Sequence, residues 1–473
     1  MTNEKNKTVT TLAPSLQSTP DTPSSSPISP RSPYGPPTAP LRPFFSVGPM
    51  TSRGENVEAT YRNRGNKHCL APSPRTRMML HSLLVVLLLT ACNGKNTGRK
   101  LYSPSEVAFS VTCDPLFDNQ LYPSLILATD QSLNISVTAP ADNCVLRVIL
   151  DSSALNYVTI VQEILPHRGE QYTFSLTPKW KYQALRRTRQ PHPIDITFTC
   201  YINDEQVDIK NLHLSCRSVN ECPLSLSTAN QQRDFRFLFA AYVNEDHPQI
   251  EHILTDILDQ GIVTRLSGYQ ASEREVREQV FAVWYYALNR GISYSSISCT
   301  SNPSPGANVQ HIRFFDEVWN TRQANCIDAC VFLASILRKS GLKPVIFVEP
   351  CHAYLGYYTD RNRRHLQLLE TTITSWVNFP DLQRSFDANG TLPQEKFDKV
   401  AKYLSQKDIS RWQNGTMSFD QLKVTVARSL FEKASEYDRE TYETNRQNFS
   451  DTTNISYQQL DIEQLRQYVQ PIQ

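Results

Sequence analysis

The sequence predicts an α+β protein in which a β-sandwich-like domain is followed by helices around an antiparallel hairpin. A change of hydrophobic period predicts this class. Apolar residues recur at every second position in short runs between 101 and 225, and at intervals of three and four beyond 228. The 473 residues are 40% hydrophobic, with 48 basic and 46 acidic side chains and a net charge of +2. This balance fits a soluble protein of two or three domains and indicates no nucleic-acid partner.

Residues 1–77 differ in composition from the rest of the chain. They hold 13 of the 30 prolines and show neither helical nor strand periodicity. Such a segment buries too little apolar surface to fold, so we expect it to be disordered. The alternative expectation is a start assigned too early, with Met78 or Met79 as the true first residue.

A short apolar run follows in the stretch RTRMMLHSLLVVLLLTAC, which ends at Cys92. Basic residues precede the run, and it is too short to cross a bilayer as a helix. The stretch resembles a bacterial lipoprotein signal peptide over 78–91, with Cys92 as the lipidated residue and 92–100 as a linker. That resemblance implies an exported protein, anchored by lipid to a membrane of the bacterial cell envelope. The other interpretation is a buried apolar segment after a disordered tail.

The segment 101–225 is predicted to form short strands, because turn residues separate its period-two runs. This spacing is typical of a β-sandwich, and we find no site chemistry in it. The predicted strands are 133–139, 144–150, 157–164, 172–176, 194–202 and 211–216. Its cysteines could pair as disulfides in an exported protein or stay buried as free thiols, and both options stay open. They are Cys113, Cys144, Cys200, Cys216 and Cys222.

The segment 228–377 begins with a helical pattern. Apolar residues recur at helical spacing, and Gly261 and Gly291 stand where helices would end. The predicted helices are 235–243, 249–261 and 272–291.

A helical extension is predicted over 378–473. Ser418 and Gln421 have the spacing of a capping box there, and they predict one long helix from 418 to 447.

A largely buried helix is predicted from Cys326 to Lys339, with Gly341 as its stop. Cys326 falls in the first turn of this helix. There the positive end of the helix dipole and the unpaired N–H groups favour a thiolate, which is the form that attacks carbonyl carbons. Cys330 lies one turn deeper, and we interpret it as a core residue.

A predicted hairpin places a histidine opposite a glutamate. If the polar stretch 359–363 is the loop, paired residues have numbers that add to 722, as those of His352 and Glu370 do. Directly opposed side chains have Cβ atoms roughly 4.5 to 5.5 Å apart, while Leu355 and Tyr357 project from the other face. The pair would either serve catalysis or act only as a structural cross-strand contact.

The order of Cys326, His352 and Glu370 is that of a nucleophile, a base and an acid that orients the base. The imidazole can take the thiol proton, and the carboxylate can hold the imidazolium by its other nitrogen. The motifs that carry these residues are NCIDACVFLASILRKSGL, CHAYLGYY and LLETT.

These motifs resemble the transglutaminase-like superfamily of papain-type thiol enzymes over about residues 310–377. The resemblance implies a Cys-bearing helix packed on strands, with Cys326, His352 and Glu370 as catalytic residues. It implies acyl transfer from amides of proteins or peptides through a Cys thioester, to water or an amine, without a required cofactor. Glu370 stands where the family usually has Asp, and Ala324-Asn325 stands where it commonly has Gly or Gln.

Two competing interpretations concern the same residues. Cys326, Cys330, Cys351 and His352 would suit zinc, but Cys351 and His352 are neighbours on a strand and point to opposite faces, so we predict no metal site. The other is a catalytically inactive transglutaminase-like module that binds a partner at the membrane. The reactivity of the thiol separates this module from an enzyme.

Overall fold

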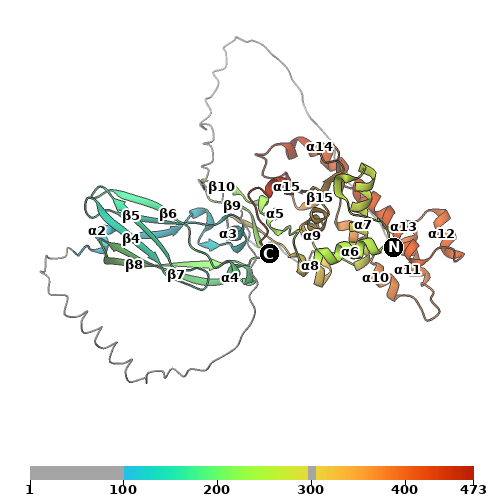
Figure 1. Ribbon diagram of the computed structural model, residues 1–473, viewed down its shortest axis with the longest axis horizontal. Coiled ribbons are helices and arrows are strands. Elements are labelled where there is room, and N and C mark those ends of the chain that lie inside the picture. The colour runs from blue at the N-terminus through green and yellow to red at the C-terminus, as the bar shows by residue number, and fades with distance from the viewer. Residues whose placement is uncertain (1–100, 297–304, 473) are drawn as a thin grey trace, which may run out of the picture. The chain divides into compact units, whose positions relative to one another are not determined.

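The computed structural model describes residues 101–296 and 305–472. The segment 1–77, the predicted signal peptide and the predicted lipid anchor Cys92 lie outside these residues. Helices alternate with sheets that are largely antiparallel, which confirms the predicted α+β class (Figure 1).

Residues 104–216 contain two sheets that share one hydrophobic core. One sheet has the strand order β1-β3-β6, and the other has the order β2-β8-β7-β4-β5. Alternate residues of β3 and β4 are buried, and both strands contribute these residues to the shared core. The elements are α2 (Pro104–Val107), β1 (Ser110–Cys113), η1 (Pro115–Phe117), β2 (Gln120–Leu121), α3 (Pro123–Thr129), β3 (Leu133–Thr138), β4 (Cys144–Leu150), β5 (Thr159–Leu165), β6 (Gln171–Leu176), α4 (Tyr182–Arg187), β7 (His192–Ile202) and β8 (Glu205–Cys216).

The six predicted strands of this region correspond to β3 through β8. The last two are longer than predicted because they form one hairpin, whose turn residues Asn203 and Asp204 have φ angles of 49° and 66°. Asn and Asp tolerate this left-handed conformation better than most residues.

The five cysteines of residues 101–225 are buried as free thiols. Burial raises the pKa of Cys113, Cys200 and Cys216 to about 12 in each case. The sequence left open whether these cysteines form disulfides or stay as buried thiols. In the structure they are buried thiols, which pack as small apolar residues.

Residues 221–472 contain helices and further small sheets. The elements up to the candidate site are β9 (Glu221–Ser227), β10 (Gln232–Asp234), η2 (Arg236–Leu238), α5 (Phe239–Tyr242), α6 (Gln249–Asp259), η3 (Gly268–Gln270), α7 (Glu273–Arg290), β11 (Ser293–Tyr294), β12 (Ala307–His311), α8 (Phe315–Thr321), β13 (Gln323–Ala324) and α9 (Cys326–Lys339). The remaining elements are β14 (Pro344–Glu349), β15 (His352–Tyr358), β16 (Leu366–Leu369), η4 (Thr372–Trp376), α10 (Phe379–Arg384), α11 (Gln394–Ala401), α12 (Gln406–Gln413), α13 (Phe419–Glu436), α14 (Arg439–Ser450), β17 (Gln458–Asp461) and α15 (Ile462–Leu465).

An antiparallel sheet with the order β16-β15-β14-β17 supports the candidate site. Leu355 and Tyr357 on one face belong to the large core that includes the buried side of α9. Tyr354 and Phe347 on the other face pack against Phe449 of α14. The prediction that Leu355 and Tyr357 share a face is therefore confirmed.

Helix boundaries follow the predicted signals closely. Helix α9 begins at Cys326 and ends at Lys339, and Gly341 has a φ of 82°. Helix α7 ends at a left-handed Gly291 with a φ of 81°. The segment predicted as a helix over 235–243 instead forms the short elements η2 and α5. Glycine suits the left-handed positions because it has no Cβ atom to clash with the preceding turn.

The C-terminal helix differs from its prediction. The capping box of Ser418 and Gln421 is present at the start of α13, as predicted. The prediction of a single helix that reaches residue 447 is wrong. Helix α13 ends at Glu436, and a second helix, α14, begins at Arg439. The break places Asp438 at a buried position.

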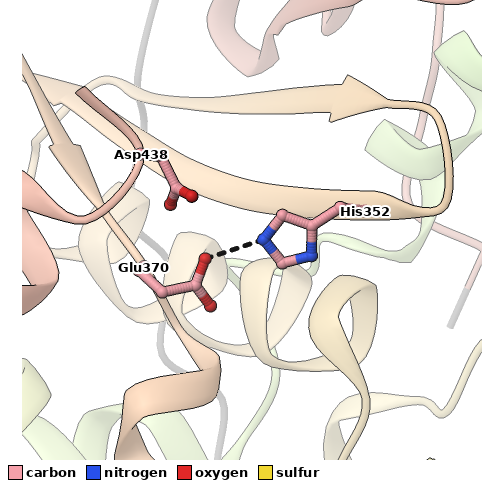
Figure 2. A group of neighbouring side chains, drawn as sticks. All are labelled: His352, Glu370 and Asp438. Atoms are coloured by element: carbon pink, nitrogen blue, oxygen red, sulfur yellow. Dashed lines mark hydrogen bonds and ion pairs between the residues drawn. The ribbon is translucent and has the colours of Figure 1, made fainter. Parts of the chain in front are cut away.

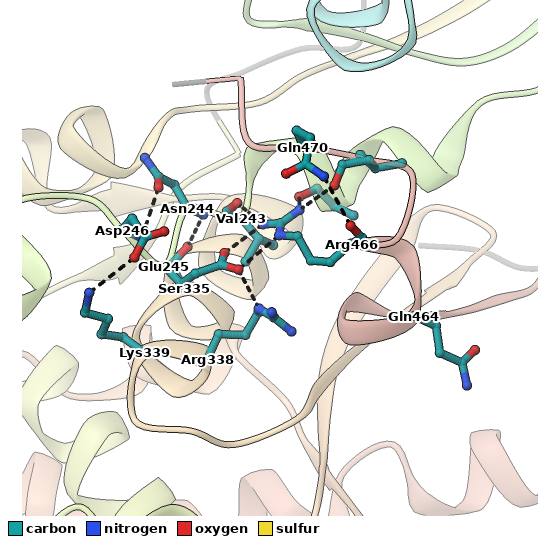
Figure 3. A network of polar contacts seen from close by, with 12 residues as sticks. Val243, Asn244, Glu245, Asp246, Ser335, Arg338, Lys339, Gln464, Arg466 and Gln470 are labelled. Carbon is teal, nitrogen blue, oxygen red and sulfur yellow. Dashed lines mark hydrogen bonds and ion pairs between the residues drawn. The ribbon is translucent and has the colours of Figure 1, made fainter. Parts of the chain in front are cut away.

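A cluster of charges ties the end of the chain to α9 (Figure 3). Glu245 accepts hydrogen bonds from Arg466 at 2.8 and 3.0 Å and from Arg338 of α9 at 2.8 Å. Burial raises the pKa of Glu245, but the hydrogen bonds from Arg466 outweigh the burial and lower the pKa to about 2.

Across residues 101–296 and 305–472, no helix has both the length and the hydrophobicity needed to cross a membrane.

Candidate active site

Cys326 is the first residue of α9, and its neighbours fix the start of that helix. The side chain of Asn325 accepts the N–H of Asp328 at 2.8 Å, and the carboxylate of Asp328 accepts the N–H of Asn325 at 3.0 Å. Asp328 is fully buried, and Arg313 offsets its charge through a hydrogen bond of 2.7 Å. The N–H groups of a first turn have no acceptor inside the helix; Asn325 takes that of Asp328, which leaves those of Cys326 and Ile327 beside the thiol.

Cys326 and His352 line one cavity of about 320 Å³. Leu224, Phe239 and Val348 supply apolar wall to the same cavity. Burial lowers the pKa of His352, but hydrogen bonds with Cys326 and Glu370 outweigh the burial and raise this pKa to about 11. The raised pKa favours an imidazolium beside the sulfur, and such a neighbour stabilises a thiolate.

The register of the hairpin differs from the predicted one. Leu355 pairs with Leu369 and Tyr358 with Leu366, so the paired numbers add to 724 rather than 722. His352 and Glu370 are thus not directly opposed; the observed register, extended by one pair, sets Glu370 against Tyr354. A shift of two residues keeps each side chain on its predicted face, because side chains alternate with a period of two.

His352 and Glu370 are nevertheless in direct contact. Nε2 of His352 lies 2.7 Å from Oε2 of Glu370 (Figure 2), whose side chain is fully buried. The other oxygen of Glu370 accepts the N–H of Thr372 at 2.6 Å, which fixes the orientation of the carboxylate. Burial raises the pKa of Glu370, but hydrogen bonds from His352 and Asp438 outweigh it and lower the pKa.

Asp438 is a site residue that the sequence did not reveal. It lies at the break between α13 and α14, and its side chain points toward Glu370 (Figure 2). Ligand atoms of His352, Glu370 and Asp438 lie within 4.8 Å of one another. Burial raises the pKa of Asp438, and a hydrogen bond with Glu370 raises it further, to about 8.

The donors of the zinc interpretation do not form one group: Cys326 contacts His352, but Cys351 lies in the turn before β15, with a φ of 65°, and not on a strand as predicted. Cys330 is fully buried, where desolvation raises its pKa well above the usual value, and Cys351 is exposed. Among the residues that the structure describes, the group of donors close enough for a metal is His352, Glu370 and Asp438. The 2.7 Å contact between Nε2 and Oε2 has the geometry of a hydrogen bond between a base and a carboxylate, and we interpret the group in that way.

Two further ionisable residues surround the site and were also missed. Glu349 pairs with His352 across β14 and β15, and burial raises its pKa. Oε2 of Glu349 is buried and has no hydrogen-bond partner among the described residues. Burial also raises the pKa of the Tyr294 hydroxyl, with smaller contributions from the nearby Cys326 and Glu370.

Comparison with known proteins adds no relative to this geometry. The chain matches no protein-family model, and its sequence matches no curated protein.

Proposed function

We propose that the protein is a thiol-dependent acyl transferase or peptidase of the transglutaminase-like type, with a β-sandwich-like domain before a transglutaminase-like core and helical flanks. The observation that carries the proposal is the connected series Cys326, His352 and Glu370, which begins at a helix N-terminus. A nucleophile, a base and an orienting carboxylate in this order are the requirement for covalent catalysis by a thiol.

In the proposed reaction the thiolate of Cys326 attacks the carbonyl carbon of an amide. The C–N bond breaks, and the imidazolium of His352 gives its proton to the departing amine. Water or another amine then attacks the thioester and loses its proton to His352. The C–S bond breaks, and the thiolate is restored. The first-turn N–H groups of α9 offer donors for the carbonyl oxygen as it becomes negative.

The surroundings of Cys326 suit a peptide or protein substrate, and the proposed lipid anchor would place that substrate in the cell envelope. Apolar side chains line the cavity together with the polar side chains of Asn308, Gln310 and Glu349, so it combines a surface for apolar groups with several polar anchors. The chemistry does not require a metal or an organic cofactor. Both hydrolysis and transfer to an amine use the same groups.

A burst experiment with p-nitrophenyl acetate tests the proposal. The native protein should release about one nitrophenolate per chain in a fast phase and carry an acetyl group on Cys326, detected by mass spectrometry of the acid-quenched protein. Cys326→Ala should abolish the burst, whereas Cys351→Ser, which changes an exposed thiol in the wall of the same cavity, should keep it. A native protein without burst or acetylated Cys326 would support the inactive binding module instead.

We also propose that the chain is exported and anchored through lipid on Cys92. A chain that starts at Met79 and is expressed in bacteria should be cleaved before Cys92, incorporate a labelled fatty acid and sediment with membranes. Cys92→Ser should remove both the label and the sedimentation, while Cys113→Ser should retain them. Absence of label from the unchanged chain would refute the anchor.

A further inference from the structure

Two buried carboxyl groups meet behind His352. The side chains of Glu370 and Asp438 belong to residues that are 0% and 5% exposed. Glu370 uses its two oxygens to accept hydrogen bonds from His352 and from the N–H of Thr372. Oδ2 of Asp438 is buried and receives no N–H or O–H donor from the described residues. A buried carboxylate oxygen without a donor is costly, so this atom needs an explanation.

A proton on Asp438 provides that explanation. The carboxyl oxygens of Glu370 and Asp438 lie within 4.8 Å of each other. Two buried carboxylates this close repel each other strongly when both are charged, so such a pair usually shares one proton. We propose that Asp438 holds a proton, donates it in a hydrogen bond to Glu370, and thereby positions the Glu370 carboxylate against His352. Asp438 is then a positioning residue, which acts on the thiol through Glu370 and His352.

The proton belongs on Asp438 because Glu370 has the better partners as an anion. Glu370 accepts from an imidazolium and a backbone N–H, and hydrogen bonds lower its pKa despite burial. Among the described residues no Lys or Arg forms an ion pair with Asp438, which faces Glu370, and its pKa is raised to about 8 although His352 lowers it. The other titratable groups around Asp438 are Glu349, His352, Tyr354 and Cys330.

The break in the C-terminal helix is what brings Asp438 to this place. The N–H of Glu370 donates to the carbonyl of Ala434 near the end of α13, with a distance of 2.8 Å. The N–H of Tyr442 donates to the carbonyl of Asp438, while the Asp438 side chain makes no capping hydrogen bond to α14. The side chain is therefore left for Glu370, although an aspartate at this position would ordinarily cap the helix.

The shared proton predicts how stability depends on pH. An acid whose pKa is higher in the folded than in the unfolded state binds more protons when folded, so its contribution to stability falls as the pH rises between the two pKa values. For Asp438 this window extends from about 4, the usual aspartate pKa, to about 8. Above the window Asp438 and Glu370 are both charged in the folded protein and repel each other.

Asp438→Asn and Asp438→Ala, each made in the full-length protein, test the inference. The asparagine amide keeps a donor for Glu370 and cannot ionise. The unfolding temperature of the unchanged protein should fall, relative to that of Asp438→Asn, by about 2 °C or more between about pH 5 and pH 8. Asp398→Asn, which alters an exposed carboxylate, should not change the pH dependence. Parallel curves for the unchanged protein and Asp438→Asn would overturn the shared proton.

The rate of alkylation of Cys326 tests the positioning role, which rests on the proposed function. Asp438→Ala should lower this rate about tenfold, and Asp438→Asn should restore most of it because the donor is present again. Equal losses in both variants would overturn the positioning role. The unfolding curves do not depend on a reactive thiol. If Cys326 is inert but the unfolding temperatures of the unchanged protein and Asp438→Asn still diverge with pH, the proposed function is refuted and the shared proton is supported.

Discussion

Iodoacetamide should alkylate Cys326 in the native protein at least roughly tenfold faster than Cys330. The alkylating species is the thiolate, and its rate depends on thiolate content and access. Cys326 is partly exposed at a helix start and beside an imidazolium, whereas Cys330 is fully buried and its pKa is raised. Brief labelling followed by peptide mass spectrometry measures both positions in one sample.

Cys351 provides the matched control for exposure. It is an exposed thiol that lines the same cavity but takes no part in the contacts among Cys326, His352 and Glu370. Near pH 6 an ordinary exposed thiol is mostly protonated, so Cys326 should outpace Cys351 most clearly in mild acid. His352→Ala should remove this advantage. Equal rates at Cys326 and Cys330, or preference for Cys330, would mean that the wrong cysteine has been chosen.

Helix α9 could be predicted from the sequence because its signals are local. Apolar residues at helical spacing run from Cys326 to Lys339, and Gly341 stops the helix where predicted. The register of the hairpin could not be predicted so well. The carboxylate of Asp360 accepts the N–H groups of Asn362, Arg364 and His365, which extends the loop past the polar stretch and moves the pairing by two.

The position of Asp438 depends on contacts between distant parts of the chain. No glycine or proline marks the break between α13 and α14, and the sequence there favours a continuous helix. The break coincides with contacts that a local pattern does not encode: Phe431 and Ala434 belong to the large core, while Tyr442 and Phe449 pack on the other face of the sheet. The sole local signal is that aspartate favours helix starts over helix interiors.

Replacing Glu370 by Gln should lower the alkylation rate of Cys326 by about 10- to 100-fold while the protein stays folded. The amide has nearly the same shape as the carboxylate but no charge. Without that charge the pKa of His352 falls from about 11, and the imidazolium that supports the thiolate is lost at lower pH. The acid limb of the rate against pH should therefore move, which loss of packing alone would not cause. Glu443→Gln, an exposed change in α14, is the control.

The same change should alter stability with a defined sign. A histidine whose pKa is raised on folding contributes stability that is fully present below its unfolded pKa of about 6.5 and is lost as the pH rises through about 11. Glu370→Gln removes much of this contribution, so the variant should be less stable than the unchanged protein in mild acid. The difference should shrink above pH 9, and urea unfolding at several pH values measures it.

Replacing Glu370 by Asp separates charge from reach. In the observed register Glu370 lies diagonal to His352, and diagonal side chains have Cβ atoms roughly 7 to 8 Å apart rather than the 5 Å of an opposed pair. The extra methylene of glutamate bridges this longer gap, which gives a physical reason for Glu where the transglutaminase-like resemblance would place Asp. Glu370→Asp keeps the charge but retracts the carboxylate, so we expect it to restore little of the rate lost in Glu370→Gln. Full reactivity in the Asp variant would show that charge alone suffices, and an unchanged rate in the Gln variant would remove Glu370 from the triad.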